Sequence, residues 1–322
     1  ILYLLISVLT IFTSNDIVIL TFTPFIVYFA KHTKINPIPY LVMEFAAANT
    51  WSMALLIGNP TNIFISSINN IDFISYFKVM ILPTLAAGIL EFILIYLLFR
   101  KSLSKPFEPY DEEVKLNNKK DTIVGVVILL TCLVMLVISN YIHLAMWIIS
   151  LGAMCILLIY FLITSLYRGD FVSSGKEIFK SLPYEVIPFV ISMFIIVLAL
   201  NKQEISKVFA DFLGNSNTIW TYGYSSYLAC NLMNNIPMSI LYSTLPSNIS
   251  DITEMNRAIY ASIVGSNIGA FLTPIGALAG IMFTTLLKKY DVKYTFKTFT
   301  LYGVLISVPT ISITLLVLFF II

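Results

Sequence analysis

The segment Gly58-Asn59-Pro60-Thr61-Asn62 interrupts an apolar run that extends from residue 38 to residue 66. Proline lacks the amide hydrogen that a helix interior needs, and glycine lets two backbones approach closely. The Asn and Thr side chains supply neutral hydrogen-bond donors and acceptors. Irregular backbone in an apolar run is tolerated only where it is buried in protein or lines a wet cavity. The segment therefore predicts a broken helix at a functional site.

Composition around this segment is that of a membrane protein. The 322 residues are 58% hydrophobic and 11% charged, whereas a soluble domain carries about 25% charged residues. The net charge of +2 gives no support for nucleic-acid binding. The three cysteines, Cys132, Cys155 and Cys230, are far apart and have no histidine close by. We therefore expect no metal centre, no redox pair and no cofactor.

Three further polar clusters interrupt apolar segments in the same way. Each combines Asn, Ser or Thr with residues that break a helix or cap one. With the first they are Ser14-Asn15-Asp16, Gly58-Asn59-Pro60-Thr61-Asn62 (preceded by Asn49, Thr50 and Ser52), Asn234-Asn235-Ile236-Pro237, and Gly265-Ser266-Asn267-Ile268-Gly269 followed by Thr273-Pro274-Ile275-Gly276. One such cluster is often only a kink. Four in corresponding places favour a binding site for an ion or a small solute.

Apolar runs between the polar breaks predict an all-α polytopic membrane protein, since a bilayer core needs about 20 apolar residues per helix. Two re-entrant hairpins are expected, at 1–30 and 218–245, because their arms are too short to cross comfortably. Two broken helices are expected at 38–66 and 258–287. The other expected helices are 79–99, 122–140, 142–165, 183–200 and 299–321.

The order of these segments predicts two inverted repeats. The second repeat, 122–322, has three helices, a hairpin, a broken helix and a last helix. The first, 1–99, has only a hairpin, a broken helix and a last helix, so about three scaffold helices are expected before residue 1. Segment 100–121 is polar and charged, and we interpret it as a linker.

Basic residues orient the predicted helices. The loops 31–37, 100–121, 166–182 and 288–298 hold 15 of the 19 Lys and Arg residues. The positive-inside rule then makes these loops cytoplasmic, with 201–217 and 246–257 outside. This split requires the hairpin at 218–245 to return to its own side, while the hairpin at 1–30 is not tested by it.

The four clusters together resemble the arsenite permease and citrate-transporter-like families of the ion transporter superfamily, over essentially the whole chain. The resemblance implies a scaffold and a mobile transport part, often in a homodimer. It also implies that hairpin tips and broken-helix loops form two half-sites for a cation or a substrate. By this resemblance the binding residues are Asn15, Asn59, Thr61, Asn62, Asn235, Asn267 and Thr273. The neighbouring Ser14, Asp16, Asn234 and Ser266 complete the predicted site.

Ionisable groups in apolar segments are functional candidates, because burying a charge in lipid is costly. Asp16 is the strongest, and it is expected either to bind Na⁺ or to carry a proton, with a helix cap as the alternative. Glu44 and Glu91 are expected to reach the membrane interface. Glu185 is interpreted as a first-turn residue, and His32 and His143 are assigned no role.

These observations predict a secondary active transporter of a small inorganic or organic anion or metalloid, in the plasma membrane, coupled to H⁺, Na⁺ or the membrane potential. A Na⁺/H⁺ antiporter of the same superfamily is the alternative, and an ion channel is a further one. The sequence has no H-E-x-x-H, G-x-S-x-G or phosphate-binding loop with its lysine, so we expect no enzyme.

Overall fold

The computed structural model describes residues 1–104, 118–138, 144–169 and 202–322, with a few isolated positions between these ranges. The regular secondary structure of the described residues is helical, as the composition predicted. Contacts divide the chain into two compact units, Ile1–Tyr110 with Val190–Ile322, and Asp111–Phe189. The predicted linker at 100–121 and the predicted helix at 183–200 lie largely outside the described residues.

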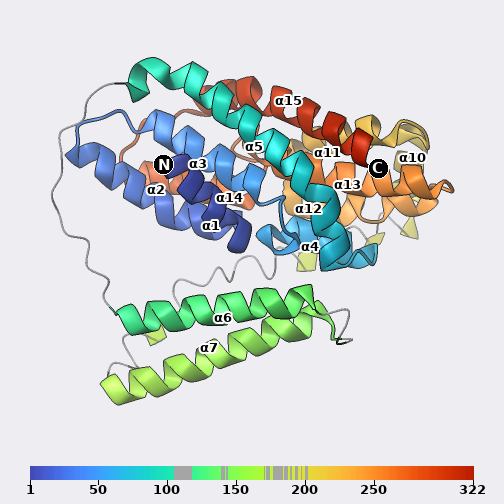
Figure 1. Cartoon of the computed structure of the whole chain (residues 1–322). Helices are drawn as coiled ribbons and strands as arrows, with labels where there is room; N and C mark the ends of the chain where they lie inside the picture. The colour runs from blue at the N-terminus through green and yellow to red at the C-terminus, as the bar shows by residue number, and fades with distance from the viewer. Residues whose placement is uncertain are drawn as a thin grey trace. The chain divides into compact units, whose positions relative to one another are not determined.

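The front part of the first unit contains two short helices, an interrupted segment and one long helix (Figure 1). Its elements are α1 (Leu2–Phe12), α2 (Asn15–His32), α3 (Ile38–Trp51), η1 (Leu56–Gly58), α4 (Pro60–Ile68) and α5 (Phe73–Leu103). Ser14 ends the first interruption as the N-cap of α2. Asn59 ends the second as the N-cap of α4, with Pro60 in the first helical position, where its missing N–H costs nothing.

The back part of the first unit has a similar order of elements, with an additional α-helix at its start and an additional 3-10 helix before its interrupted segment. The elements of the back part are α10 (Ile205–Leu213), α11 (Thr218–Met233), α12 (Asn235–Tyr242), η2 (Leu245–Asn248), α13 (Ile252–Ile268), η3 (Gly269–Phe271), α14 (Leu278–Lys289) and α15 (Phe296–Ile321). Asn234 separates α11 from α12 and has a φ of 75°. Asn is one of the few residues besides glycine that populate positive φ, so this position suits the sharp change of direction.

Three described helices are long and apolar enough to cross a membrane by length and composition: Phe73–Leu103, Trp147–Arg168 and Phe296–Ile321. The first and last of these, α5 and α15, pack against each other in the first unit (Figure 1). Their outward faces carry exposed leucine, isoleucine and phenylalanine side chains, including Ile89, Leu97 and Phe320. Such faces suit lipid rather than water.

Helices α11 and α13 approach each other closely at Gly265. A Cβ added there would contact the Ser226 hydroxyl oxygen and lie 2.6 Å from the Gly223 carbonyl oxygen and 2.8 Å from the Tyr227 amide nitrogen. Two of these three obstacles are backbone atoms, which cannot move away by changing rotamer. The missing side chain therefore sets the distance between the two helices.

We expect Gly265→Ala to destabilise the protein by about 1–3 kcal/mol, the usual cost of overpacking a close-packed interior. Thermal unfolding of the detergent-solubilised protein measures the effect. Gly152→Ala is the matched control, because a Cβ at Gly152 meets no atom within 4 Å and alanine favours a helix over glycine by about 0.5–1 kcal/mol. Equal unfolding temperatures for the two variants would contradict the close approach.

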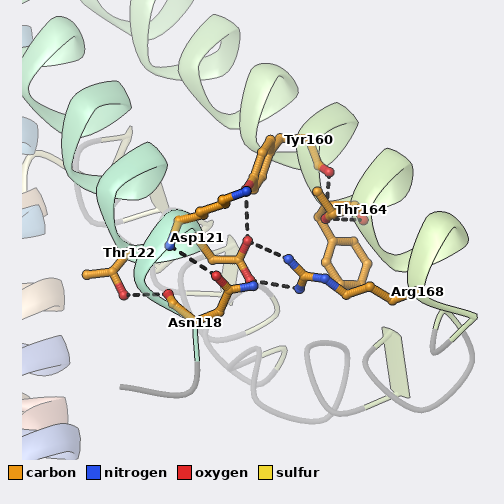
Figure 2. A network of polar contacts seen from close by, with 8 residues as sticks. Asn118, Asp121, Thr122, Tyr160, Thr164 and Arg168 are labelled. Carbon is orange, nitrogen blue, oxygen red and sulfur yellow. Dashed lines mark hydrogen bonds and ion pairs between the residues drawn. The ribbon is translucent and has the colours of Figure 1, made fainter. Parts of the chain in front are cut away.

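The second unit contains the antiparallel pair α6 (Lys119–Val137) and α7 (Met146–Arg168). Figure 2 shows how their ends are joined. The Asp121 carboxylate accepts hydrogen bonds from both terminal nitrogens of Arg168, at 2.7 and 2.8 Å, and from the Tyr160 hydroxyl at 2.8 Å. These interactions hold the pKa of Asp121 at about 2. The bidentate pair fixes the register of α6 against α7.

One helix was not predicted. The segment 201–217 was interpreted as a loop, and it contains α10, whose Val208 and Phe212 side chains are exposed. The apolar residues of α10 recur at helical spacing, but the run is too short to register as a membrane-length segment.

Candidate functional site

A short polar turn precedes the second helix in each of two helix pairs, α1–α2 and α11–α12. We call these the first and the second polar turn. Ser14 is the N-cap of α2 and accepts a hydrogen bond from the Ile17 amide, 3.4 Å away. Asn234 is the N-cap of α12, and its side-chain oxygen accepts from the Ile236 amide at 3.3 Å. The residue that follows each cap is an asparagine, Asn15 or Asn235. The two asparagines therefore occupy the same helical position, the first, in α2 and in α12.

Asn15 and Asn235 are buried, with 1% and 3% of their surfaces exposed. The Asn15 side-chain amide donates to Oδ1 of Asn49 on α3 at 3.0 Å. The Asn235 backbone amide donates to the Gly276 carbonyl oxygen at 2.9 Å. In the part of the chain that the structure describes, the side-chain oxygen of each is buried and accepts no hydrogen bond. Buried polar atoms rarely lack a partner, and each exception needs an explanation.

A second cluster joins the two interrupted segments through Asn267 on α13. Its side-chain oxygen accepts from the Asn59 side-chain amide at 2.8 Å, and its own amide donates to Oδ1 of Asn62 at 2.7 Å. The Ser52 hydroxyl lies 2.9 Å from the same Asn267 oxygen. All four side chains are almost completely buried. The amide of Asn267 is thus hydrogen-bonded through both of its ends.

Thr61 and Ser266 extend this cluster. Their hydroxyl oxygens are 2.9 Å apart, and both side chains are fully buried. The Asn62 amide donates to the Ser52 carbonyl oxygen at 2.9 Å, inside the interruption between α3 and α4. We call these side chains, Ser52, Asn59, Thr61, Asn62, Ser266 and Asn267, the Asn267 cluster. Its hydrogen bonds join the two sides of the interruption between α3 and α4 and connect that interruption to α13.

The loop after η3 lies against the second polar turn. Asn231 on α11 accepts hydrogen bonds from the Thr273 amide at 3.1 Å and from the Thr273 hydroxyl at 2.7 Å. The Asn234 side-chain amide donates to the Ile275 carbonyl oxygen at 3.1 Å. Together with the bond from Asn235 to Gly276, these contacts fix the second turn to the loop 273–276.

Asp16 lies in the first turn of α2 and is half-buried. A negative charge is favoured there by the partial positive charge of the helix N-terminus. The cap itself is Ser14, so the capping alternative for Asp16 is wrong. The carboxylate remains next to Asn15 in sequence, beside the first polar turn.

Glu44 and Glu91 were expected to reach the membrane interface, and this prediction is wrong. Both side chains are fully buried. The Thr23 hydroxyl on α2 lies 3.0 and 3.2 Å from the two Glu44 oxygens. Glu91 on α5 contacts the hydroxyls of Tyr3 and Thr50. The sequence showed only their distance from the ends of the apolar runs, and the packing of α1, α2 and α3 around them could not be read from it.

The electrostatic character of the interior is uniform. Among the described residues, the buried polar side chains are Asn, Ser and Thr, apart from Glu44 and Glu91, and include no Lys or Arg. The described residues also contain no group of three or more His, Cys, Asp or Glu side chains placed to hold a metal ion. Apart from the Asp16 carboxylate, the site is therefore built from neutral amides and hydroxyls.

All eleven of the predicted site residues lie in one of two kinds of place. The Asn267 cluster contains Asn59, Thr61, Asn62, Ser266 and Asn267. The two polar turns and their supports contain Ser14, Asn15, Asp16, Asn234, Asn235 and Thr273. Sequence reasoning passed over Asn49 and Asn231 as partners. A signal for Asn49 was present, since Asn49 and Asn267 each precede a glycine, Gly58 or Gly276, by nine residues.

Comparison with known proteins gives one family and several relatives. The family model described as Citrate transporter matches residues 1–265. A protein called Arsenical pump membrane protein from Escherichia coli is 24% identical over 316 residues, which cover 94% of this chain and 72% of that protein. A protein of the same name from Yersinia enterocolitica is 21% identical, with the same two shares. The 46 kDa membrane protein of Mycobacterium leprae (strain TN) is 24% identical, covering 93% and 71%.

Proposed function

The chain belongs to the citrate transporter family, and from that premise we propose that it is a secondary active transporter that binds a small anion or metalloid between two inverted repeats. The family resemblance predicted from the polar clusters is confirmed, and the protein is a multi-pass membrane transporter rather than an enzyme. The mode of transport, the repeats and the site are our proposal.

The observation that carries the proposal is the pair of unpartnered oxygens at the polar turns. Oδ1 of Asn15 and Oδ1 of Asn235 are buried without a hydrogen-bond donor within the described part of the chain. An amide oxygen of this kind can replace water around a cation or accept from a substrate hydroxyl. Each turn sits at the start of a short helix, which leaves further backbone N–H groups available to an anion. We assign each turn to one half-site.

Contacts within the first unit support the inverted repeats. Helix α2 contacts α14, and its counterpart α12 contacts α4. Likewise α1 packs on α3 as α11 packs on α13, and α5 packs on α15. Exchanging the two halves maps each of these five contacts onto another of them or onto itself, as expected for two copies related by a two-fold axis.

Both interruptions contain a glycine that lies close to an earlier backbone carbonyl. A Cβ on Gly58 would contact the Ser52 carbonyl oxygen, and one on Gly276 would lie 3.1 Å from the Ala270 carbonyl oxygen and 2.8 Å from the Gly269 carbonyl oxygen. The Ser52 and Ala270 carbonyls each belong to the residue six positions before the glycine. The repeated close approach supports a common origin for the two turns.

The chemistry of the interior favours a neutral or weakly charged substrate. Because the described buried residues include no Lys or Arg, a multiply charged anion such as citrate would enter without a countercharge, at a cost of several kcal/mol. Arsenite, with hydroxyl groups that neutral amides and hydroxyls can bind, fits better. The relatives named as arsenical pump membrane proteins support this choice.

Coupling and assembly complete the proposal. We assign Asp16 to cation binding beside Asn15, because it is the ionisable residue of the first polar turn. We place the protein in the plasma membrane as a homodimer, on the family resemblance alone. A Na⁺/H⁺ antiporter remains the alternative, and the polar turns would then hold the exchanged cation.

We expect proteoliposomes that contain the protein expressed from its complete gene to accumulate arsenite against its gradient when a proton or Na⁺ gradient is imposed. Arsenite, citrate and Na⁺ fluxes are measured side by side, with protein-free vesicles as the control. Saturable uphill arsenite flux supports the proposal. Na⁺ exchange without arsenite flux favours the antiporter, and an ohmic current with no uphill flux favours a channel; either result contradicts the proposal.

A further inference from the structure

A buried carboxylic group outside the two polar turns lies where α1, α3 and α5 meet. Oε1 of Glu91 on α5 is 3.2 Å from the Tyr3 hydroxyl oxygen on α1, and Oε2 accepts a hydrogen bond from the Thr50 hydroxyl on α3. The Tyr3 hydroxyl oxygen is also 2.7 Å from the Gly88 carbonyl oxygen and 3.1 Å from Nε1 of Trp51. We call these five residues, Tyr3, Thr50, Trp51, Gly88 and Glu91, the Glu91 cluster.

The single hydrogen of the Tyr3 hydroxyl indicates whether Glu91 is protonated. The hydroxyl has one hydrogen to donate and can also accept. Trp51 Nε1–H is only a donor, and the Gly88 carbonyl is only an acceptor. The hydrogen of Tyr3 therefore goes to the Gly88 oxygen, which is the shorter contact. The contact between Tyr3 and Glu91 is then satisfied only if Glu91 itself supplies a hydrogen.

The surrounding charges agree with a neutral Glu91. In the described residues, α1 contributes only Tyr3 as a titratable group, and η1 contributes none. The titratable groups of α3 are Tyr40 and Glu44, and the nearer of these in sequence is a carboxylic group six residues before Thr50. None of these three elements, α1, η1 and α3, contains a cationic residue that could balance a negative charge on Glu91.

The cations of α5 and α15 form no ion pair with Glu91 among the described residues. Helix α15 carries only Lys297 and Tyr302, and the Tyr302 ring contacts Phe99, two turns along α5 from Glu91. The other titratable groups of α5 are Tyr76, Lys78, Tyr96, Arg100 and Lys101. No described residue forms an ion pair with Glu91. An isolated buried carboxylate would be strongly disfavoured, so the neutral acid is the form that fits.

We propose that Glu91 is a proton-binding site, protonated while the Glu91 cluster is packed and deprotonated when α1 moves away and water enters. The step is balanced: the O–H bond of the Glu91 acid breaks, its proton passes to a water molecule, and the negative carboxylate stays in the opened cavity. The Tyr3 hydroxyl, no longer held between two partners, follows α1. The cluster therefore links a proton to the position of the first helix.

The cluster is adjacent to the first polar turn. Thr50, which bonds Glu91, is the neighbour in sequence of Asn49, which accepts a hydrogen bond from Asn15. Helix α1 leads directly to Ser14 and Asn15. Resting on the proposed function, this arrangement makes Glu91 the residue through which a proton gradient acts on the half-site at Asn15, and linkage requires the substrate to act on the proton in return.

Infrared spectroscopy of the purified full-length protein tests the protonation state without a transport assay. We expect the wild type to show a carboxylic acid C=O band that is weaker in Glu91→Gln, which lacks the contribution of Glu91. Glutamine is neutral and similar in shape, so the variant is expected to fold. A spectrum in which Glu91→Gln instead removes a carboxylate band overturns the proposal.

Fluorescence tests whether the protonation of Glu91 is coupled to the packing of the Glu91 cluster. Trp51 belongs to the cluster, and Trp147→Phe with Trp220→Phe leaves it as the sole tryptophan of these 322 residues; any tryptophan outside them is replaced by phenylalanine as well. We expect its emission to change as the pH is raised through the deprotonation of Glu91, and Glu91→Gln to abolish that response. Glu44→Gln, which alters an equally buried acid bonded to Thr23, is the matched control and should keep it. An emission that is independent of pH in the wild type, or a response that survives in Glu91→Gln, refutes the proposal.

Flux measurements separate this inference from the proposed function. In proteoliposomes Glu91→Gln should keep downhill arsenite flux and lose its stimulation by a proton gradient. Retained stimulation refutes the role of Glu91. Absence of arsenite flux in the wild type refutes the proposed function, while the infrared and fluorescence results still decide whether Glu91 binds a proton.

Discussion

Asn267→Ala is expected to lower the free energy of unfolding by about 2–6 kcal/mol. The substitution takes away the partners of the Asn59 amide and of the Asn62 oxygen, which are both buried. Leaving one buried polar group unsatisfied costs about 1–3 kcal/mol, and two are affected. The loss is comparable to the whole stability of many domains. We expect a fall of several degrees in the unfolding temperature of the detergent-solubilised protein, with poor yield.

Two comparisons make this measurement specific. Asn248→Ala removes an exposed asparagine whose amide donates to the Leu245 carbonyl oxygen at 3.3 Å, and its effect should stay within about 0.5 kcal/mol. Asn267→Asp keeps an acceptor for Asn59 but buries a carboxylic group with no cation beside it, so its cost should fall as the pH is lowered and the neutral acid can donate to Asn62. An unfolding temperature for Asn267→Ala equal to that of the wild type would show that the Asn267 cluster contributes nothing to stability.

Asn15→Ala and Asn235→Ala are expected to act on binding instead. Each removes a buried oxygen that has no hydrogen-bond donor among the described residues, so little protein–protein interaction is lost with it. A bound cation or substrate would lose one partner, at about 1–3 kcal/mol. Since 1.4 kcal/mol is a factor of ten, each variant should weaken the apparent affinity for arsenite, or for the coupling cation, about ten-fold or more.

Asn69→Ala is the matched control for these two variants. Asn69 is half-buried at the end of α4 and donates to the Ser243 carbonyl oxygen at 3.1 Å, away from both polar turns. Its loss should leave the affinity unchanged. If Asn15→Ala and Asn235→Ala bind and transport like Asn69→Ala, the assignment of the half-sites to the two turns is wrong.

The two sets of predictions differ because the structure divides the asparagines into two groups. From sequence, Asn15, Asn59, Asn235 and Asn267 were expected to share one role as ion ligands. Asn59 and Asn267 bond each other across the two interruptions, whereas Asn15 and Asn235 keep an oxygen without a donor in the described chain. We therefore propose that the first pair positions the site and the second pair binds.

Sequence by itself determined the class of the protein and the places where its helices break. Low charge and long apolar runs require a membrane environment. The interruptions near Ser14, Pro60, Asn234 and Pro274 follow from residues that cap or cannot continue a helix. These are local properties, since they depend on a residue and its immediate neighbours. The family could be predicted for the same reason, because its motifs are short and contiguous.

Only the tertiary structure decided what each polar side chain does. Asn49 accepts from Asn15 over 34 positions, and Asn59 donates to Asn267 over 208. Glu91 is buried and does not reach the interface, because Tyr3, 88 positions earlier, packs against it. A polar residue in an apolar run needs a hydrogen-bond partner. The neighbouring sequence does not say whether that partner is a lipid headgroup, a bound ion or a residue on a distant helix. Packing decides this, because burial and hydrogen bonding depend on segments that the chain brings together only when it folds.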